Sequence, residues 1–136
     1  MAEYAEIIAV FTARVFLGLL FFFQGYDKVF KVKIPGVVRT FEQPYRQTRF
    51  PMFLLYAGAA VTSFIELIAG LLLILGLFKY VALYLLAFDL LIAAAGLSLI
   101  NPMWDLKFSF PRLVLLVFLL VTPPEWDQWM VDRWLN

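Results

Sequence analysis

The chain has 136 residues, of which 64% are hydrophobic and 15% are charged, and its mean hydropathy is +0.89. Soluble domains have roughly half apolar and a quarter charged residues, so this composition predicts a membrane protein. The 11 basic and 10 acidic residues leave a net charge of +1, so no strong field favours nucleic acid as a partner. Because the chain has no Cys and no His, it cannot by itself perform dithiol chemistry, bind zinc through thiolates or ligate haem through imidazole.

The first apolar run extends from about residue 6 to residue 30, which exceeds the roughly 20 residues that a helix needs to cross a bilayer. Glu3 and Glu6 lie where a secretory signal would carry positive charge, and no small-residue cleavage site follows the run. We therefore expect a membrane span that is retained in the protein.

A polar, basic connection, KVKIPGVVRTFEQPYRQTRFP, follows the first run. Its charge keeps it out of lipid, and Pro35, Pro44 and Pro51 interrupt any long helix. We expect at most a short surface helix near residues 37–41.

Two further apolar runs cover about residues 51–78 and 79–100. Gly76 and Lys79 leave almost no loop between them, which predicts two antiparallel neighbouring helices.

A fourth apolar run covers about residues 105–122 and contains Pro111. A helix that began at Pro111 would have about 12 residues and would be too short to cross a bilayer. We expect this helix to begin near Asp105 and to kink or fray at Pro111. Together the four spans predict an all-α integral membrane four-helix bundle over residues 1–122.

Residues 123–136 form a tail of different character. Pro123 and Pro124 end the fourth span and can begin a new helix. One side of that helix would carry Trp126, Trp129, Met130 and Trp134, and the other would carry Asp127, Gln128 and Asp132. Because tryptophan favours the headgroup level, we expect an amphipathic surface helix that anchors the tail at the membrane interface, with partner binding as the alternative.

Loop charge predicts the orientation in the membrane. With four spans, both termini lie on the same side as Lys79 and Arg133. The other side carries Lys28, Lys31, Lys33, Arg39, Arg46, Arg49 and Lys107. The positive-inside rule places this second side in the cytoplasm and both termini outside.

Small and polar residues recur at helical spacing on one face of each of the first three spans. These stripes contain Arg14, Gly18, Gly25 and Lys28 in the first span, Gly58, Thr62, Glu66 and Gly70 in the second, and Ala82, Asp89, Ala93 and Gly96 in the third. Small residues let helices approach closely in lipid, so we expect the five glycines to be helix-packing positions and the charges to face the bundle interior.

The candidate site is therefore a buried polar cluster of Arg14, Glu66, Asp89 and Arg112. Measured from the outer ends of their spans, the first three lie within about 8 Å of the same depth, so we expect Arg14 to bond Glu66, Asp89 or both. Either Arg112 joins them or one carboxyl holds a proton, although Arg112 can also extend to the surface. Such a cluster can hold a polar ligand head, relay protons, or simply fix helix register.

The segments RVFLGLLFFFQGYDKVF and RFPMFLLYAGAAVTSFIELIAGLLLILGLF resemble the DoxX family of small four-span bacterial membrane proteins. The resemblance covers roughly the first two-thirds of the chain and marks Arg14, Gly18, Gly25, Lys28, Glu66, Gly70 and Gly76. The family's usual C-terminal Gly-Pro-Gly and Ser-Leu-Asp ending is replaced here by the Trp-rich tail. Through the small subunit of thiosulfate:quinone oxidoreductase, the resemblance implies a bacterial inner-membrane location and an association with quinone-linked redox complexes.

Three classes of function follow. The first is an accessory subunit of a larger membrane complex whose chemistry resides in the cofactors of a partner. The second is a protein that binds a small ligand, a quinone among the possibilities, around Arg14, Glu66 and Asp89 in a pocket closed by Phe21, Phe22 and Tyr26. The third is a proton pathway or small transporter, disfavoured because the sequence has no inverted repeats. We assign no catalytic residue and no metal site.

Overall fold

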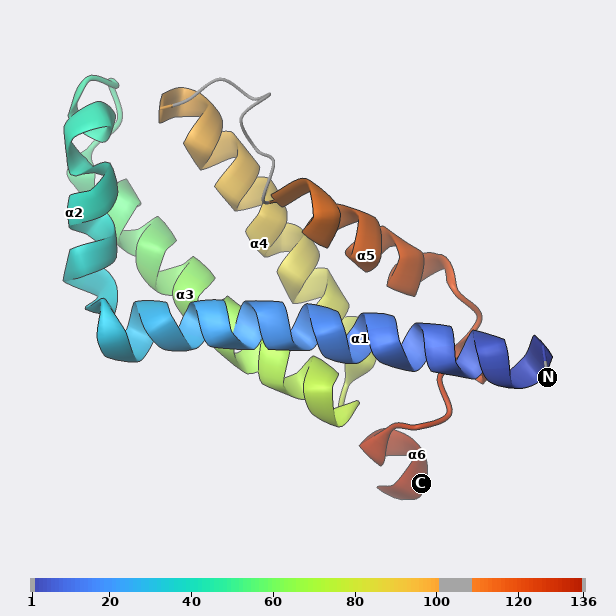
Figure 1. Cartoon of the computed structure of the whole chain (residues 1–136). Coiled ribbons are helices and arrows are strands. Elements are labelled where there is room, and N and C mark those ends of the chain that lie inside the picture. The colour runs from blue at the N-terminus through green and yellow to red at the C-terminus, as the bar shows by residue number, and fades with distance from the viewer. Residues whose placement is uncertain (1, 101–108, 136) are drawn as a thin grey trace.

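The computed structural model describes residues 2–100 and 109–135, and every regular element in them is helical (Figure 1). In chain order the elements are α1 (Ala2–Tyr26), one π-helical turn η1 (Asp27–Lys31), α2 (Lys33–Arg46), α3 (Met52–Leu75), α4 (Lys79–Ile100), α5 (Ser109–Val121), a 3-10 turn η3 (Pro124–Trp126) and α6 (Val131–Leu135). The predicted all-α class is confirmed.

Three helical segments are long and apolar enough to cross a membrane: Tyr4–Lys31, Met52–Leu75 and Lys79–Gly96. A shorter apolar helix, Phe110–Val121, accompanies them. The start predicted near Asp105 lies outside the described residues. Pro111 is the third residue of α5 as described, a position at which a missing N–H removes no hydrogen bond within the described helix.

The turn between α3 and α4 is as short as predicted. Gly76 has a φ of 75°, a left-handed conformation that glycine adopts without steric cost. Its N–H donates to Leu72 O over 2.8 Å, and the N–H of Leu77 donates to the same carbonyl over 2.9 Å. These bonds close the end of α3 and send α4 back beside it.

Helices α1 and α3 pack backbone against backbone in opposite directions. A Cβ atom added at Gly25 would lie 2.4 Å from Leu67 N, and one at Gly70 would lie 2.5 Å from Phe22 N. At Gly18 the added atom would lie 2.9 Å from Gly70 O. Gly18, Gly25 and Gly70 thus lie in the close contact between the two helices.

Gly58 and Gly96 make no such contact, because a Cβ atom at either position would meet nothing within 4 Å. The expectation that they pack against a neighbouring helix is wrong. Both instead line a pocket that is described below.

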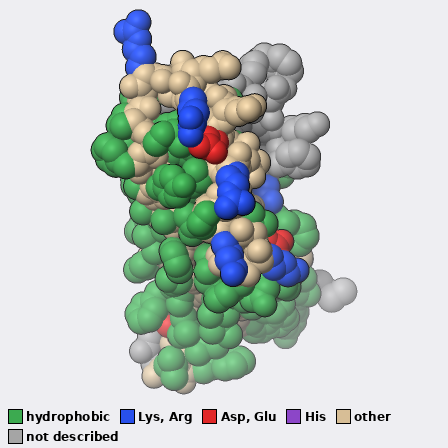
Figure 2. Space-filling view, turned by 90° about the vertical axis from the view of Figure 1, so that its left-hand side faces the viewer, with side chains coloured by type: hydrophobic (Ala, Val, Ile, Leu, Met, Phe, Trp, Pro, Cys, Tyr) green, Lys and Arg blue, Asp and Glu red, His purple; other side chains and the backbone are tan. Residues whose placement is uncertain are grey.

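The core is an apolar layer shared by α1, α3, α4 and α5. Its fully buried members include Leu17, Phe21, Leu73, Leu83, Leu86, Leu116 and Leu119. Outward-facing residues of the same helices are also apolar, so hydrophobic side chains cover much of the face seen in Figure 2. This surface suits a bilayer rather than water.

Helix α2 is longer than the sequence predicted, because its prolines lie at positions where they interrupt few helical hydrogen bonds. Pro35 is the third residue, among the N–H groups that a helix leaves unpaired, and Pro44 lies in the last turn. Val38 and Tyr45 on its inner side are buried, and Val38 packs in a small core with Ala59 of α3. In Figure 1 α2 stands beside the first half of α3.

The tail does not form the single amphipathic helix that we expected. It consists of η3, an irregular segment and the five-residue α6. Trp126 packs against the core, the Trp129 ring lies edge-on to Phe11 at 5.2 Å, and Trp134 is 77% exposed. The three tryptophans therefore do not share one face, and the tail folds back onto the end of the bundle.

Candidate functional site

The first buried group of charges, the tail cluster, consists of Arg14, Lys79 and Asp127. Arg14 Nε donates to Asp127 Oδ1 over 3.2 Å, and Lys79 Nζ lies 2.9 Å from Asp127 Oδ2. All three residues are at most 4% exposed. One carboxylate from the tail therefore pairs with two cations, one from each of two helices.

The rest of the Arg14 guanidinium closes the end of α3. Its Nη1 donates to the carbonyls of Leu73 and Ile74, which no longer have helical partners. Its Nη2 donates to Trp129 O over 2.6 Å. Arg14 thus joins the first span, the end of the second and the tail.

The expectation that Arg14 bonds Glu66 or Asp89 is wrong. The contact between α1 and α3 places Gly25 beside Leu67, so Arg14 reaches the level of Leu73, seven residues beyond Glu66 and about 10 Å away along the helix. The depth estimate assumed that the span ends were aligned, whereas α1 extends well past α3.

Asp127 was expected on the polar side of an amphipathic tail helix, opposite the tryptophans, and is instead 1% exposed. Sequence reasoning missed both Asp127 and Lys79 as partners of Arg14. One usable signal was the short turn at Gly76, which puts Lys79 at the same end of the bundle as Arg14. Nothing in the sequence distinguished Asp127 from the other tail acids.

The second buried group, the pocket cluster, is centred on Glu66 of α3, which is 2% exposed. Lys28 Nζ lies 3.2 Å from Glu66 Oε1 and 3.1 Å from Oε2. Gln24 Nε2 donates to Oε1 over 3.4 Å. Sequence analysis placed Lys28 on the interior face of its span but did not count it among the site residues.

Asp89 and Arg112 complete the pocket cluster. Asp89 is buried against the Glu66 carboxyl, and Lys28 and Arg112 are the cations that act on it. The Arg112 guanidinium is half-buried over the ring of Phe21, with 5.8 Å to the ring centroid. Arg112 therefore turns into the bundle, and two cations lie near two carboxyl groups there.

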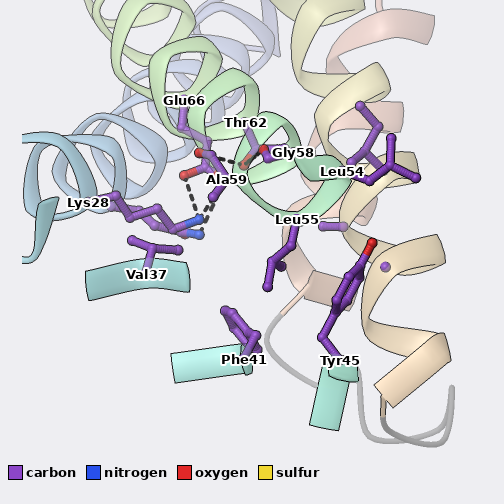
Figure 3. Close-up of a pocket in the computed structure, with 14 residues that line it drawn as sticks. Lys28, Val37, Phe41, Tyr45, Leu54, Leu55, Gly58, Ala59, Thr62 and Glu66 are labelled. Atoms are coloured by element: carbon purple, nitrogen blue, oxygen red, sulfur yellow. Dashed lines mark hydrogen bonds and ion pairs between the residues drawn. The ribbon is translucent and has the colours of Figure 1, made fainter. Parts of the chain in front are cut away.

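A pocket of about 350 Å³ opens beside this cluster (Figure 3). Its lining residues come from the end of α1, from η1, and from α2, α3 and α4: Gln24, Lys28, Val37, Phe41, Tyr45, Leu54, Leu55, Gly58, Ala59, Thr62, Glu66, Ile92, Ala93 and Gly96. The volume falls within the range of known small-molecule sites, roughly 300–1,000 Å³.

The pocket has one ionic end and long apolar walls. Figure 3 places Lys28, Glu66 and Thr62 at one end, and Tyr45 at the other end beyond Leu55. Gly58 and Gly96 leave open the space that side chains would fill.

Three aromatic residues that we expected to close a pocket do not line this one. Phe21 is buried in the core, and the rings of Phe22 and Tyr26 pack against each other with centroids 6.4 Å apart. Arg14, in the tail cluster, does not line it either. Within residues 2–100 and 109–135, no three His, Cys, Asp or Glu side chains come together as a metal site would require.

The sequence model of the DoxX family matches residues 9–99, two-thirds of the chain, and the protein therefore belongs to the DoxX family. No curated protein and no solved structure matches the chain significantly. The matched segment contains every residue that lines the pocket, together with Asp89. Arg112 and Asp127 lie beyond it.

Proposed function

We propose that this DoxX-family membrane protein binds a small amphipathic molecule in the pocket between α2, α3 and α4. The observation that carries the proposal is the pocket itself, whose ionic end at Lys28 and Glu66 continues into walls of Val37, Phe41 and Leu55. Such walls suit an alkyl, isoprenoid or aromatic body, and the ionic end suits a polar head. A quinone, which the sequence resemblance suggests, is one member of this class.

The position of the pocket in the chain supports the proposal. Its walls come from two membrane-length helices and from α2, so a ligand dissolved in the bilayer reaches it without crossing water. Leu54, which lines one wall, is exposed and marks a side of the pocket that the described residues do not close.

A second proposal, that the protein is an accessory subunit of a larger membrane complex, rests on its composition. The chain has no Cys and no His, so electrons for a bound quinone would come from the cofactors of a partner. Co-purification from native membranes tests this role. A chain that runs alone and monomeric in mild detergent leaves the accessory role without support.

A proton pathway or transport function has less support. Leu17 and Phe21 lie between Arg14 and Lys28 in the first span, and Leu86 lies between Lys79 and Asp89 in α4. All three are buried, and their side chains cannot carry protons. Proton or substrate flux in reconstituted vesicles, compared with that of Glu66→Gln, tests this alternative. Vesicles of the unmodified protein without flux would end it.

For the location we propose a bacterial inner membrane with both termini outside. Helix α2 and its flanking turns expose Lys31, Lys33, Arg39, Arg46 and Arg49, and Figure 2 displays Lys and Arg side chains gathered on this face. The positive-inside rule favours the cytoplasm for this end of the bundle. Lys107, which also contributed to the sequence prediction, lies outside the described residues.

Filling the pocket tests the binding function. In Gly58→Leu a side chain enters the pocket without meeting a neighbouring atom at Cβ, whereas Ala57→Leu adds similar bulk at the adjacent, exposed position. We expect the ligand-induced rise in melting temperature with short-chain quinones and alkylphenols to be lost in Gly58→Leu and kept in Ala57→Leu. If Gly58→Leu responds like the unmodified protein, the ligand does not bind in this pocket.

A further inference from the structure

Apart from the Lys28 ammonium and the second N–H of Gln24, the described polar side chains that line the pocket have only hydrogen-bond acceptors left for a ligand. From this we infer that the pocket selects a ligand whose head group donates hydrogen bonds, such as an alcohol, a phenol or a hydroquinone, over the matching carbonyl or ether. The inference rests on the proposed function, because it specifies the ligand class of the same site.

Both hydroxyl groups in the pocket lining have already used their protons. Tyr45 Oη donates to Pro51 O over 3.2 Å, and Thr62 Oγ1 donates to Gly58 O over 2.7 Å. A hydroxyl has one proton to donate and two lone pairs with which to accept. What Tyr45 and Thr62 can still offer a ligand is therefore an acceptor.

Gln24 presents an acceptor for a different reason. A carboxylate only accepts, so the hydrogen bond from Gln24 to Glu66 fixes which end of the amide is Nε2. The other end, Oε1, is buried and has no hydrogen-bond partner among the described residues. A buried acceptor without a partner costs free energy, and a ligand N–H or O–H would remove that cost once a small rotation of the Gln24 amide brings Oε1 to the pocket surface.

Glu66 reinforces the same preference. Its carboxylate accepts and carries negative charge, so it repels an anionic head group and attracts a donor. The only cation in the described lining, Lys28, lies within 3.2 Å of both Glu66 oxygens. Of the three N–H groups of Lys28, a ligand carbonyl or phosphate can bind only the one that Glu66 leaves, beside a carboxylate that repels it, whereas a ligand hydroxyl can donate directly to the acceptors.

The arrangement in Figure 3 also indicates how such a ligand lies. One donor group meets Thr62 and Glu66 at the ionic end, where Gln24 donates to Glu66, and the apolar body runs along Leu55 and Phe41. Tyr45 Oη, across Leu55, can accept from a second donor at the far end of the ligand. A hydroquinone offers two hydroxyl donors, and a quinone offers none.

The decisive experiment compares ligands that differ only in the donor. A 4-hexylphenol and its methyl ether share ring, chain and oxygen, and only the phenol has a proton to donate. For the unmodified protein in detergent, we expect calorimetry to give at least about tenfold tighter binding of the phenol, the factor that corresponds to one good hydrogen bond. A short-chain hydroquinone, held reduced under argon, should likewise bind more tightly than its quinone.

The outcomes separate the two proposals. Equal or tighter binding of the ether and the quinone would overturn the donor preference while leaving the pocket as a binding site. If none of the four compounds binds, the proposed function fails, and the inference fails with it.

Two variants locate the preference in the pocket. Thr62→Val and Tyr45→Phe each remove one acceptor with little change in shape, and each should reduce the ratio of phenol to ether affinity. Thr40→Val is the matched control, because Thr40 also donates to the carbonyl four residues earlier, over 3.0 Å, but lies exposed on α2. A ratio that is unchanged in both pocket variants would refute the assignment of these acceptors.

Discussion

Arg14 and Asp127 form a buried ion pair although 113 residues separate them in the chain. Arg14 lies in the first membrane span, and Asp127 follows the last apolar helix. Lys79, at the start of α4, shares the same carboxylate at 2.9 Å. One acidic residue of the tail thus holds three parts of the chain together at one end of the bundle.

Replacing Asp127 should therefore destabilise the whole fold. Asp127→Asn leaves Arg14 and Lys79 buried without a counter-charge, and the loss of one member of a buried ion pair costs about 3–5 kcal/mol. Denaturant unfolding in detergent measures the loss. Glu125→Gln removes an exposed acid from the same tail and is the control. Equal stabilities for the two variants would mean that the tail cluster contributes no net stability.

The glycines should divide into two groups when alanine replaces them. Gly25→Ala forces the backbones of α1 and α3 apart, since Cβ would lie 2.4 Å from Leu67 N, and overpacking of this kind costs about 1–3 kcal/mol. Gly58→Ala meets open space and should gain about 0.5–1 kcal/mol from helix propensity. Thermal unfolding of the ligand-free variants distinguishes them. If Gly58→Ala is less stable than the unmodified protein, a neighbouring atom must lie close to Gly58, where the structure has a pocket.

Lys28 and Glu66 should be energetically coupled. Each single change, Lys28→Met or Glu66→Gln, leaves a partner in the pocket cluster without its ion pair, so the double variant should lose less than the two losses combined. We expect a coupling of about 1–3 kcal/mol from a double-mutant cycle. The exposed pair Arg46 and Glu42 on α2 provides the control cycle, with about 0.3–0.5 kcal/mol. Similar couplings in both cycles would argue against a special environment at Glu66.

The orientation can be tested directly because the chain has no native Cys. Gln43→Cys introduces an exposed thiol on α2, and Gln128→Cys introduces one in the tail. In intact bacterial spheroplasts, a membrane-impermeant maleimide should label the tail cysteine and should reach the α2 cysteine only after permeabilisation. The opposite labelling pattern would invert the proposed topology.

Much of the fold could be predicted because it depends on local properties of the chain. The lengths of the apolar runs specify three membrane helices, and the short link at Gly76 specifies the α3–α4 hairpin. The stripe of Gly18 and Gly25 correctly indicates the face that α1 turns to α3. By contrast, the prolines of α2 misled the prediction, since their effect depends on where the helix begins and ends.

The site could be predicted only in part, because a stripe of small residues has two possible meanings. Where a partner helix is close, as at Gly70, small residues permit packing, and where the helices diverge, as at Gly58 and Gly96, they leave a cavity. Where the helices diverge depends on how α2 packs against them, and helical periodicity in the sequence does not predict that packing. The partners of Arg14 depended likewise on a tail that folds back over the bundle.

The same fold-back sets an order of events during synthesis. Arg14 enters the membrane early, yet Asp127 leaves the ribosome 113 residues later, on the order of ten seconds at bacterial elongation rates. Throughout that interval Arg14 has no counter-ion from the tail. A chain that ends before Asp127 never acquires this counter-ion, so one end of its bundle is less stable than in the finished protein.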